Sequence, residues 1–92
     1  MNSTVLYSNP AIVMKKAKEL HLNPVQVSTR KDKKFMILNP NTNKLVHFGQ
    51  WGYEDYTKHH DKTRRDLFRK RNHKWKDADR YSPAWLSYHL LW

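Results

Sequence analysis

The chemistry that this chain offers most plainly is positive charge. Half of its 18 Lys and Arg residues fall between residues 58 and 76, a stretch that holds only two acidic residues, Asp61 and Asp66. A block of like charge this dense repels itself, so we expect an anionic partner opposite it. The basic residues predicted to contact that partner are Lys58, Lys62, Arg64, Arg65, Arg69, Lys70, Arg71, Lys74 and Lys76.

Three interpretations fit this block. Arg forms paired hydrogen bonds with a phosphate and Lys supplies a point charge, so the block could bind a nucleic acid backbone without regard to sequence. It could equally dock against an acidic protein surface, and the third alternative is a solvated helix face. Charge alone does not choose between the nucleic acid and the protein.

Aromatic residues accompany the charge and could stack on bases, as in proteins that bind single strands. Those considered for stacking are Trp51, Tyr53, Trp75 and Tyr81. The alternative, which the sequence favours, is that large rings near turns and helix ends fill the core and its edges in a small fold. The rings predicted to reach an interface are Trp51, Trp75, Trp85 and Trp92.

Six histidines invite a test for a metal or catalytic site. His59 and His60 are adjacent and point in different directions on a helix, and the other histidines lack the spacing of a helical zinc site. His47, His59 and Asp61 could in principle form a nuclease-like site, but no cluster of carboxylates accompanies them. We therefore expect no metal site.

Nucleotide and acyl-transfer chemistry are not expected either. Gly49 and Gly52 are the only glycines, so there is no glycine-rich phosphate loop. There is no cysteine nucleophile, and no serine lies in a recognisable nucleophile elbow. The sequence therefore predicts a protein that is not an enzyme and needs no cofactor.

Short elements are expected before the basic block. Asn9 and Pro10 match a helix cap and first helical residue, and Pro24 disfavours helix in the residue before it, so a helix is predicted over 10–21. Residues 39–44 are rich in turn formers and predict the loop of a hairpin. The strands expected are 34–38 and 45–48, with a brief third strand at 25–28.

The basic block itself is predicted to be one long helix that begins near Glu54 and Asp55, whose charges suit a helix N-terminus. Lys58, Lys62, Arg65 and Arg69 recur at helical spacing and are expected to line one exposed side. The side expected to face the hairpin carries Tyr56, His60, Leu67 and Phe68.

The end of the chain is predicted to be a short apolar helix over 84–92, after a linker at 77–79 and a second cap-and-proline pair, Ser82 and Pro83. We expect it to cover the apolar face of the hairpin. An alternative is that it plugs an interface with a neighbouring subunit. Together these elements predict a single α+β domain over residues 1–92.

Composition bounds the setting. Ninety-two residues suit one small domain, and the aromatic share of 13% argues for order despite the charge. The absence of cysteine excludes disulfides and thiolate zinc sites. No apolar run approaches the roughly 20 residues of a membrane span, and no secretory signal is expected. The expected location is the interior of a cell or of a particle.

A set of motifs follows a basic lead-in at 28–34: Lys44-Leu45-Val46-His47-Phe48-Gly49, Tyr53-Glu54-Asp55-Tyr56-Thr57-Lys58-His59, Asp61, Arg64 and Arg65, Arg71, Trp75, Tyr81-Ser82-Pro83, Leu86-Ser87 and Leu90-Leu91-Trp92. Together these motifs resemble a small basic family, of unassigned biochemical function, found in large DNA viruses and phages. The resemblance covers 28–92 and leaves 1–27 as a helical N-terminal segment or arm. It implies a viral origin and a component of the virion, and supplies no catalytic residues.

The sequence therefore leads to two expectations. The first is a minor structural or capsid protein of a large DNA virus, located in the virion and the infected host cell, which docks by charge and aromatic contacts on an acidic capsid protein surface. The second is a protein that binds the nucleic acid backbone without sequence preference. No membrane partner is expected.

Overall fold

The computed structural model describes residues 7–92 and confirms the predicted α+β class. The predicted N-terminal segment or arm covers 1–27, and its first six residues lie outside the described part of the chain. Within them, no helix is both long and apolar enough to cross a membrane. The elements are α1 (Pro10–Glu19), β1 (Val25–Val27), β2 (Lys33–Asn39), β3 (Lys44–Gln50), α2 (Tyr56–His59), α3 (Lys62–Arg71), the 3-10 helix η2 (His73–Asp77), α4 (Pro83–Leu86) and the π-helical turn η3 (Ser87–Leu91).

Helix α1 begins where the sequence predicts. Asn9 Oδ1 accepts hydrogen bonds from the N–H groups of the two residues after Pro10, at 3.1 and 3.4 Å. The helix ends two residues earlier than expected, because His21 adopts a left-handed φ of 58° and Leu22 donates its N–H back to the Ala17 carbonyl. Ala17 is buried in the shared core, so this segment packs on the body of the protein.

The strands form one antiparallel sheet in the order β1-β2-β3. Phe35 lies opposite Phe48 and Ile37 opposite Val46, which gathers the apolar side chains on one face, as the alternation predicts. The hairpin strands are longer than expected and leave a loop at 40–43. Asn43 takes a left-handed φ of 59° in that loop, a conformation that Asn tolerates better than most residues.

The C-terminal segment completes the core. Ser82 caps α4 by accepting a hydrogen bond from the Trp85 N–H at 3.2 Å, and the helix continues as η3. Trp85, Leu86 and Leu90 are buried in the same cluster as the sheet residues. The expectation that this segment covers the hairpin is therefore confirmed.

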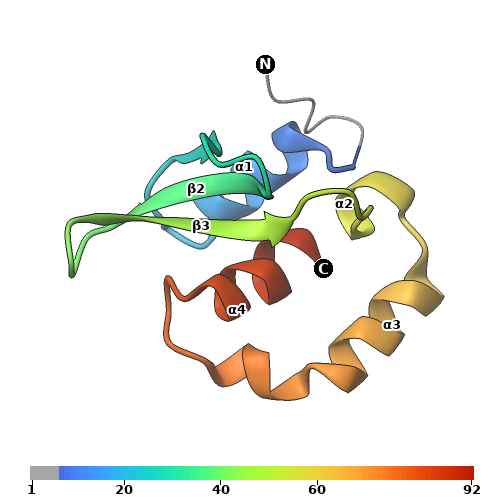
Figure 1. The fold of residues 1–92 in the computed structure, drawn as a ribbon. Coiled ribbons are helices and arrows are strands. Elements are labelled where there is room, and N and C mark those ends of the chain that lie inside the picture. The colour runs from blue at the N-terminus through green and yellow to red at the C-terminus, as the bar shows by residue number, and fades with distance from the viewer. Residues whose placement is uncertain (1–6) are drawn as a thin grey trace.

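The basic segment, however, is not the single long helix that the sequence predicts. α2 stops after one turn because His60 adopts a left-handed φ of 54°. Asp61 then caps a new helix by accepting a hydrogen bond from the Arg64 N–H at 3.1 Å. Asp is favoured at the N-cap and disfavoured inside a helix, because its short side chain bonds nearby backbone groups. The result is an arc of α2, α3 and η2 that runs around α4 and the C-terminus (Figure 1). We call this arc, residues 56–77, the basic arm.

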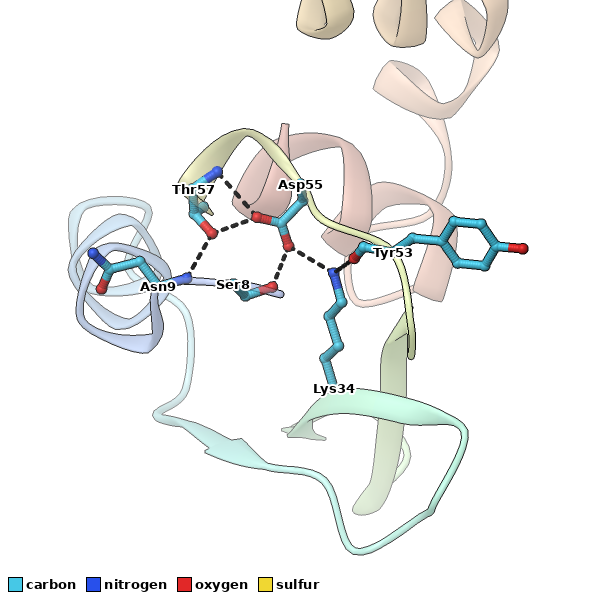
Figure 2. Close-up of polar contacts among 6 residues, drawn as sticks. All are labelled: Ser8, Asn9, Lys34, Tyr53, Asp55 and Thr57. Atoms are coloured by element: carbon cyan, nitrogen blue, oxygen red, sulfur yellow. Dashed lines mark hydrogen bonds and ion pairs between the residues drawn. The ribbon is translucent and has the colours of Figure 1, made fainter. Parts of the chain in front are cut away.

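A buried ion pair fixes the point at which the basic arm leaves the sheet (Figure 2). Lys34 Nζ on β2 lies 3.0 Å from Asp55 Oδ2, and the side chains are 2% and 1% exposed. The same ammonium donates a hydrogen bond to the Tyr53 carbonyl. The pKa of Lys34 is lowered because burial disfavours its charged form, and Asp55 opposes that effect.

The Asp55 carboxylate also binds the segment that leads into α1. Ser8 donates its hydroxyl proton to Oδ2, while Oδ1 accepts from the Thr57 hydroxyl and from the Thr57 N–H at 3.0 Å. Asn9 donates its N–H to Thr57 Oγ1 at 2.9 Å. One carboxylate thus caps α2 and ties together β2, the start of α1 and the start of the basic arm (Figure 2).

We expect Asp55→Asn or Lys34→Met to lower the free energy of unfolding by about 3–5 kcal/mol, because either change leaves an uncompensated charge or unpaired donors in the interior. The double variant should cost less than the sum of the two, since it removes both charges. Urea denaturation of the purified chain measures these values. The matched control is Asp66→Asn, which removes the Arg65–Asp66 pair, in which Asp66 is 68% exposed, and should cost below about 1 kcal/mol. If Asp55→Asn and Lys34→Met each cost no more than this control, and if their costs add in the double variant, the buried pair does not stabilise the fold as described.

Candidate functional site

An apolar groove of about 690 Å³ lies between the basic arm and the body of the protein. Its volume falls in the range of ordinary ligand sites. Phe48 and Leu91 line it from the buried core, and Leu67 and Phe68 line it from α3. The Lys34–Asp55 pair also reaches it, so the interaction that anchors the arm borders the groove.

A row of aromatic rings connects the arm to the C-terminus along this groove. Phe68 stacks on Trp92 with ring centroids 4.3 Å apart and planes 8° apart. Trp75 meets Phe68 edge to face at 5.8 Å. Arg69 adds a hydrogen bond from Nη2 to the Trp92 carbonyl at 2.8 Å. These contacts hold the arm, because α3 has no buried residue of its own.

That last fact corrects the expected orientation of the basic helix. The sequence predicts that Leu67 and Phe68 bury against the hairpin, but the Leu67 side chain is 59% exposed and Phe68 is half-buried against Trp92. The arm spans the groove, and its apolar side lines a space that the side chains of residues 7–92 leave open. Within a folded protein a helix is stabilised mainly by packing its apolar face against other elements, and α3 does so only in small part.

The structure also divides the nine predicted contact residues. Arg65 and Arg69 are half-buried: the Arg65 guanidinium lies 4.8 Å from the Tyr56 ring centroid, and Arg69 turns toward Trp92 and the Tyr88 ring. Lys58 belongs to α2. The expectation of one exposed row of Lys58, Lys62, Arg65 and Arg69 is therefore wrong, because the chain breaks at His60 and Asp61 and the two arginines face inward.

The charges of the two inward-facing arginines also affect the pKa of Lys16 on α1. Burial lowers the pKa of Lys16 most, and the charges of Arg69 and Arg65 lower it further.

Six other predicted cations are exposed and have no ion pair within residues 7–92. They are Lys62, Arg64, Lys70, Arg71, Lys74 and Lys76.

The predicted interface rings fall into different places. Trp75, 37% exposed, and half-buried Trp92 line the groove. Trp51 is half-buried and packs edge to face on Tyr7, with centroids 5.1 Å apart. Trp85 belongs to the core, so its expected place at an interface is wrong.

The rings considered for base stacking are divided in a similar way. Tyr53 lines the groove and is 69% exposed, and Trp75 lines it too. Tyr81 is buried in the core, where the sequence favours it, and its hydroxyl accepts a hydrogen bond from the Asn23 N–H at 3.1 Å.

The residues weighed for a nuclease-like site have separate partners. His47 Nδ1 lies 2.7 Å from Ser28 Oγ beside the sheet. His59 packs against Trp92 at 5.3 Å, and its Nδ1 accepts a hydrogen bond from the Asp61 N–H at 2.9 Å. In the part of the chain that the structure describes, no three His, Asp or Glu side chains are grouped to hold a metal ion.

Sequence reasoning missed the buried pair and the groove. Strand alternation places Lys34 opposite the Phe35 face, which predicts exposure, and nothing local to Lys34 signals Asp55 21 residues away. A cap pattern at Asp55, with Thr57 two residues later, was the one available signal. The groove depends on the break at His60, which the helical spacing of the cations conceals.

The comparisons with known proteins add a family but no activity. A model described as a family of unknown function (DUF5754) matches residues 24–76, which is more than half of the chain. No curated protein and no solved structure matches. The matched residues include the three strands, the buried pair and almost all of the basic arm.

The two partnered histidines predict how stability depends on pH. Burial lowers the pKa of His47, and the charge of Arg30 lowers it further. Burial also lowers the pKa of His59, and the charge of Arg64 lowers it further. Since both pKa values fall below the ordinary value of 6.5, protonation favours the unfolded chain. The contribution of these two histidines to the free energy of unfolding should be constant above about pH 7 and should decrease as the pH falls below about 6.5.

Urea unfolding at about pH 7.5, 6.5 and 5.5 measures this decrease. The variant His47→Gln/His59→Gln should lose much of it, whereas His73→Gln, at an exposed position, should retain it. A double variant that loses stability with acid as steeply as the parent chain would show that other groups are responsible.

Proposed function

Because the chain belongs to a family of unknown function (DUF5754), we propose a function from its own geometry: it is a non-enzymatic docking protein that binds an acidic protein surface through the basic arm. The observation that carries the proposal is that α3 presents Lys62, Arg64, Lys70 and Arg71 to solvent while burying none of its own residues. A helix with this composition adds little to the core of its own chain. It is suited to contact with a second molecule.

Protein is a better fit than a nucleic acid backbone because the arm offers apolar surface beside the charge. Leu67 and Trp75 are exposed large hydrophobic residues on the arm, and both line the groove. A phosphate backbone is contacted through hydrogen bonds and charge, so it would leave this apolar surface uncovered. A protein interface combines an apolar centre with a polar rim.

The setting that we propose is the particle of a large DNA virus, with the chain as a minor structural or capsid component. The support for this setting is the resemblance of 28–92 to the small basic viral family described above. Within a particle the partner is an acidic capsid protein, and the arm contacts it by charge complementarity and apolar docking.

A second candidate is a protein that binds nucleic acid without sequence preference. Tyr53 and Trp75 favour it, because both rings are exposed at the edge of a groove that also carries Arg64 and Arg71. Cations and free aromatic rings along one groove are the features that single-strand binders use.

Binding of duplex DNA and of a single-stranded dT12 oligonucleotide across a salt series separates the two candidates. For a docking protein we expect only weak binding at about 0.15 M salt, and we expect Lys62→Glu/Lys70→Glu on α3 to weaken it no more than Lys15→Glu/Lys18→Glu on α1, where both lysines are exposed. Purified particles should contain the chain at a fixed copy number.

Tight binding would contradict the docking proposal if it fell with a logarithmic slope near −0.9 per phosphate contacted and disappeared in the α3 variant alone. That result would identify the arm as a nucleic acid contact. Circular dichroism of both variants checks that the fold is retained.

A further inference from the structure

We infer that the apolar groove is the site at which the partner is held, and that its occupant is an acidic amphipathic segment of that partner. The inference rests on the proposed docking function and adds to it the recognition site and the chemistry of the ligand. It is carried by the apolar lining of the groove, the charge at its edge and the way in which α3 is held.

The lining of the groove matches aliphatic or aromatic side chains. Phe48 and Leu91 belong to the buried core and border the groove, with exposed fractions of 0% and 2%. Leu67 projects from α3 with more than half of its surface in solvent. Two or three apolar side chains of a partner helix, at helical spacing, would cover Leu67 and Trp75, which is 37% exposed, and remove their apolar surface from water.

The edge of the groove selects for acidic residues. Lys33, Arg64 and Arg71 line it, against Glu54 as the one acidic group besides Asp55. Asp55 is already paired with Lys34. The remaining charge is therefore positive, and carboxylates that flank the apolar anchors of a partner would pair with it.

A nucleic acid strand fits the same groove less well. Phe68 and Trp92 stack face to face, so each ring covers one face of the other. Trp75 and Phe68 meet edge to face. The ring faces of Phe68 and Trp92 that meet in this stack are closed to a base, and of the aromatic residues that line the groove Tyr53 is the most exposed. Bases need ring faces, whereas Leu and Phe side chains need only apolar contact.

Fluorescence anisotropy with designed peptides tests the assignment. The probe is a fluorescein-labelled helical peptide of about 15 residues, with Leu at positions i, i+4 and i+7 and Glu elsewhere on the flanks. It should bind the intact chain, and the same peptide with Ser in place of Leu, or Lys in place of Glu, should bind at least about tenfold more weakly.

Two pairs of variants locate the binding. Leu67→Glu in the groove should weaken the peptide at least about tenfold, while Leu45→Glu, at a similarly exposed leucine of the hairpin, should leave binding within about twofold. Arg71→Glu at the groove edge is matched by Lys44→Glu in the same way. Each pair changes the net charge equally, so a difference within a pair reports the position of the contact.

Each other outcome overturns the inference in its own way. If acidic peptides bind equally with Leu or Ser, and both members of each pair behave alike, acidic docking stands and the groove is not its site. If no acidic peptide binds up to about 1 mM, the docking function and the groove assignment both fail. If a dT12 oligonucleotide binds instead and loses affinity with Leu67→Glu and Arg71→Glu but not with their controls, the groove is a single-strand nucleic acid site.

Discussion

The buried pair of Lys34 and Asp55 is the interaction on which the arrangement of this small domain depends. Removing two charges from water is costly, and the structure offsets that cost by satisfying both groups: the ammonium also bonds the Tyr53 carbonyl, and the carboxylate accepts from Ser8 and Thr57 (Figure 2). Because Asp55 is also the cap of α2, the pair fixes where the basic arm leaves the sheet. Beyond this anchor, α3 buries no residue of its own, and the arm is held by its contacts with Trp92.

Local signals in the sequence were sufficient for the elements on either side of the arm. Asn9 with Pro10, the Asn-rich loop before Lys44, and Ser82 with Pro83 each act within a few residues, and the structure has a cap or turn at each place. The α+β class follows from these elements and from the alternation of apolar residues in the strands. The burial of the C-terminal helix follows too, because it has apolar residues on nearly all sides.

The arm and the groove could not be predicted, for two physical reasons. A cation recurs at helical spacing on both sides of His60, so periodicity predicts an unbroken helix, and the left-handed His60 with the Asp61 cap has no periodic signature. The second reason is distance along the chain: Lys34 and Asp55 meet only when β2 and the end of β3 are paired. Once the helix breaks, Arg65 and Arg69 turn inward and Leu67 faces open space. The exposed cations of α3 are then Lys62, Arg64, Lys70 and Arg71.

The central claim is that the groove between the arm and the body binds an acidic, apolar-faced segment of another protein. The four tryptophans test it within one sample, since Trp75 and Trp92 line the groove while Trp51 packs on Tyr7 and Trp85 lies in the core. The measurement is the two-dimensional ¹H–¹⁵N spectrum of the indole N–H groups during titration with an acidic amphipathic peptide. The account predicts that the signals of Trp75 and Trp92 shift in proportion to occupancy while those of Trp51 and Trp85 stay in place. Shifts confined to Trp51 or Trp85, or no shift in a folded chain at saturating peptide, would contradict it.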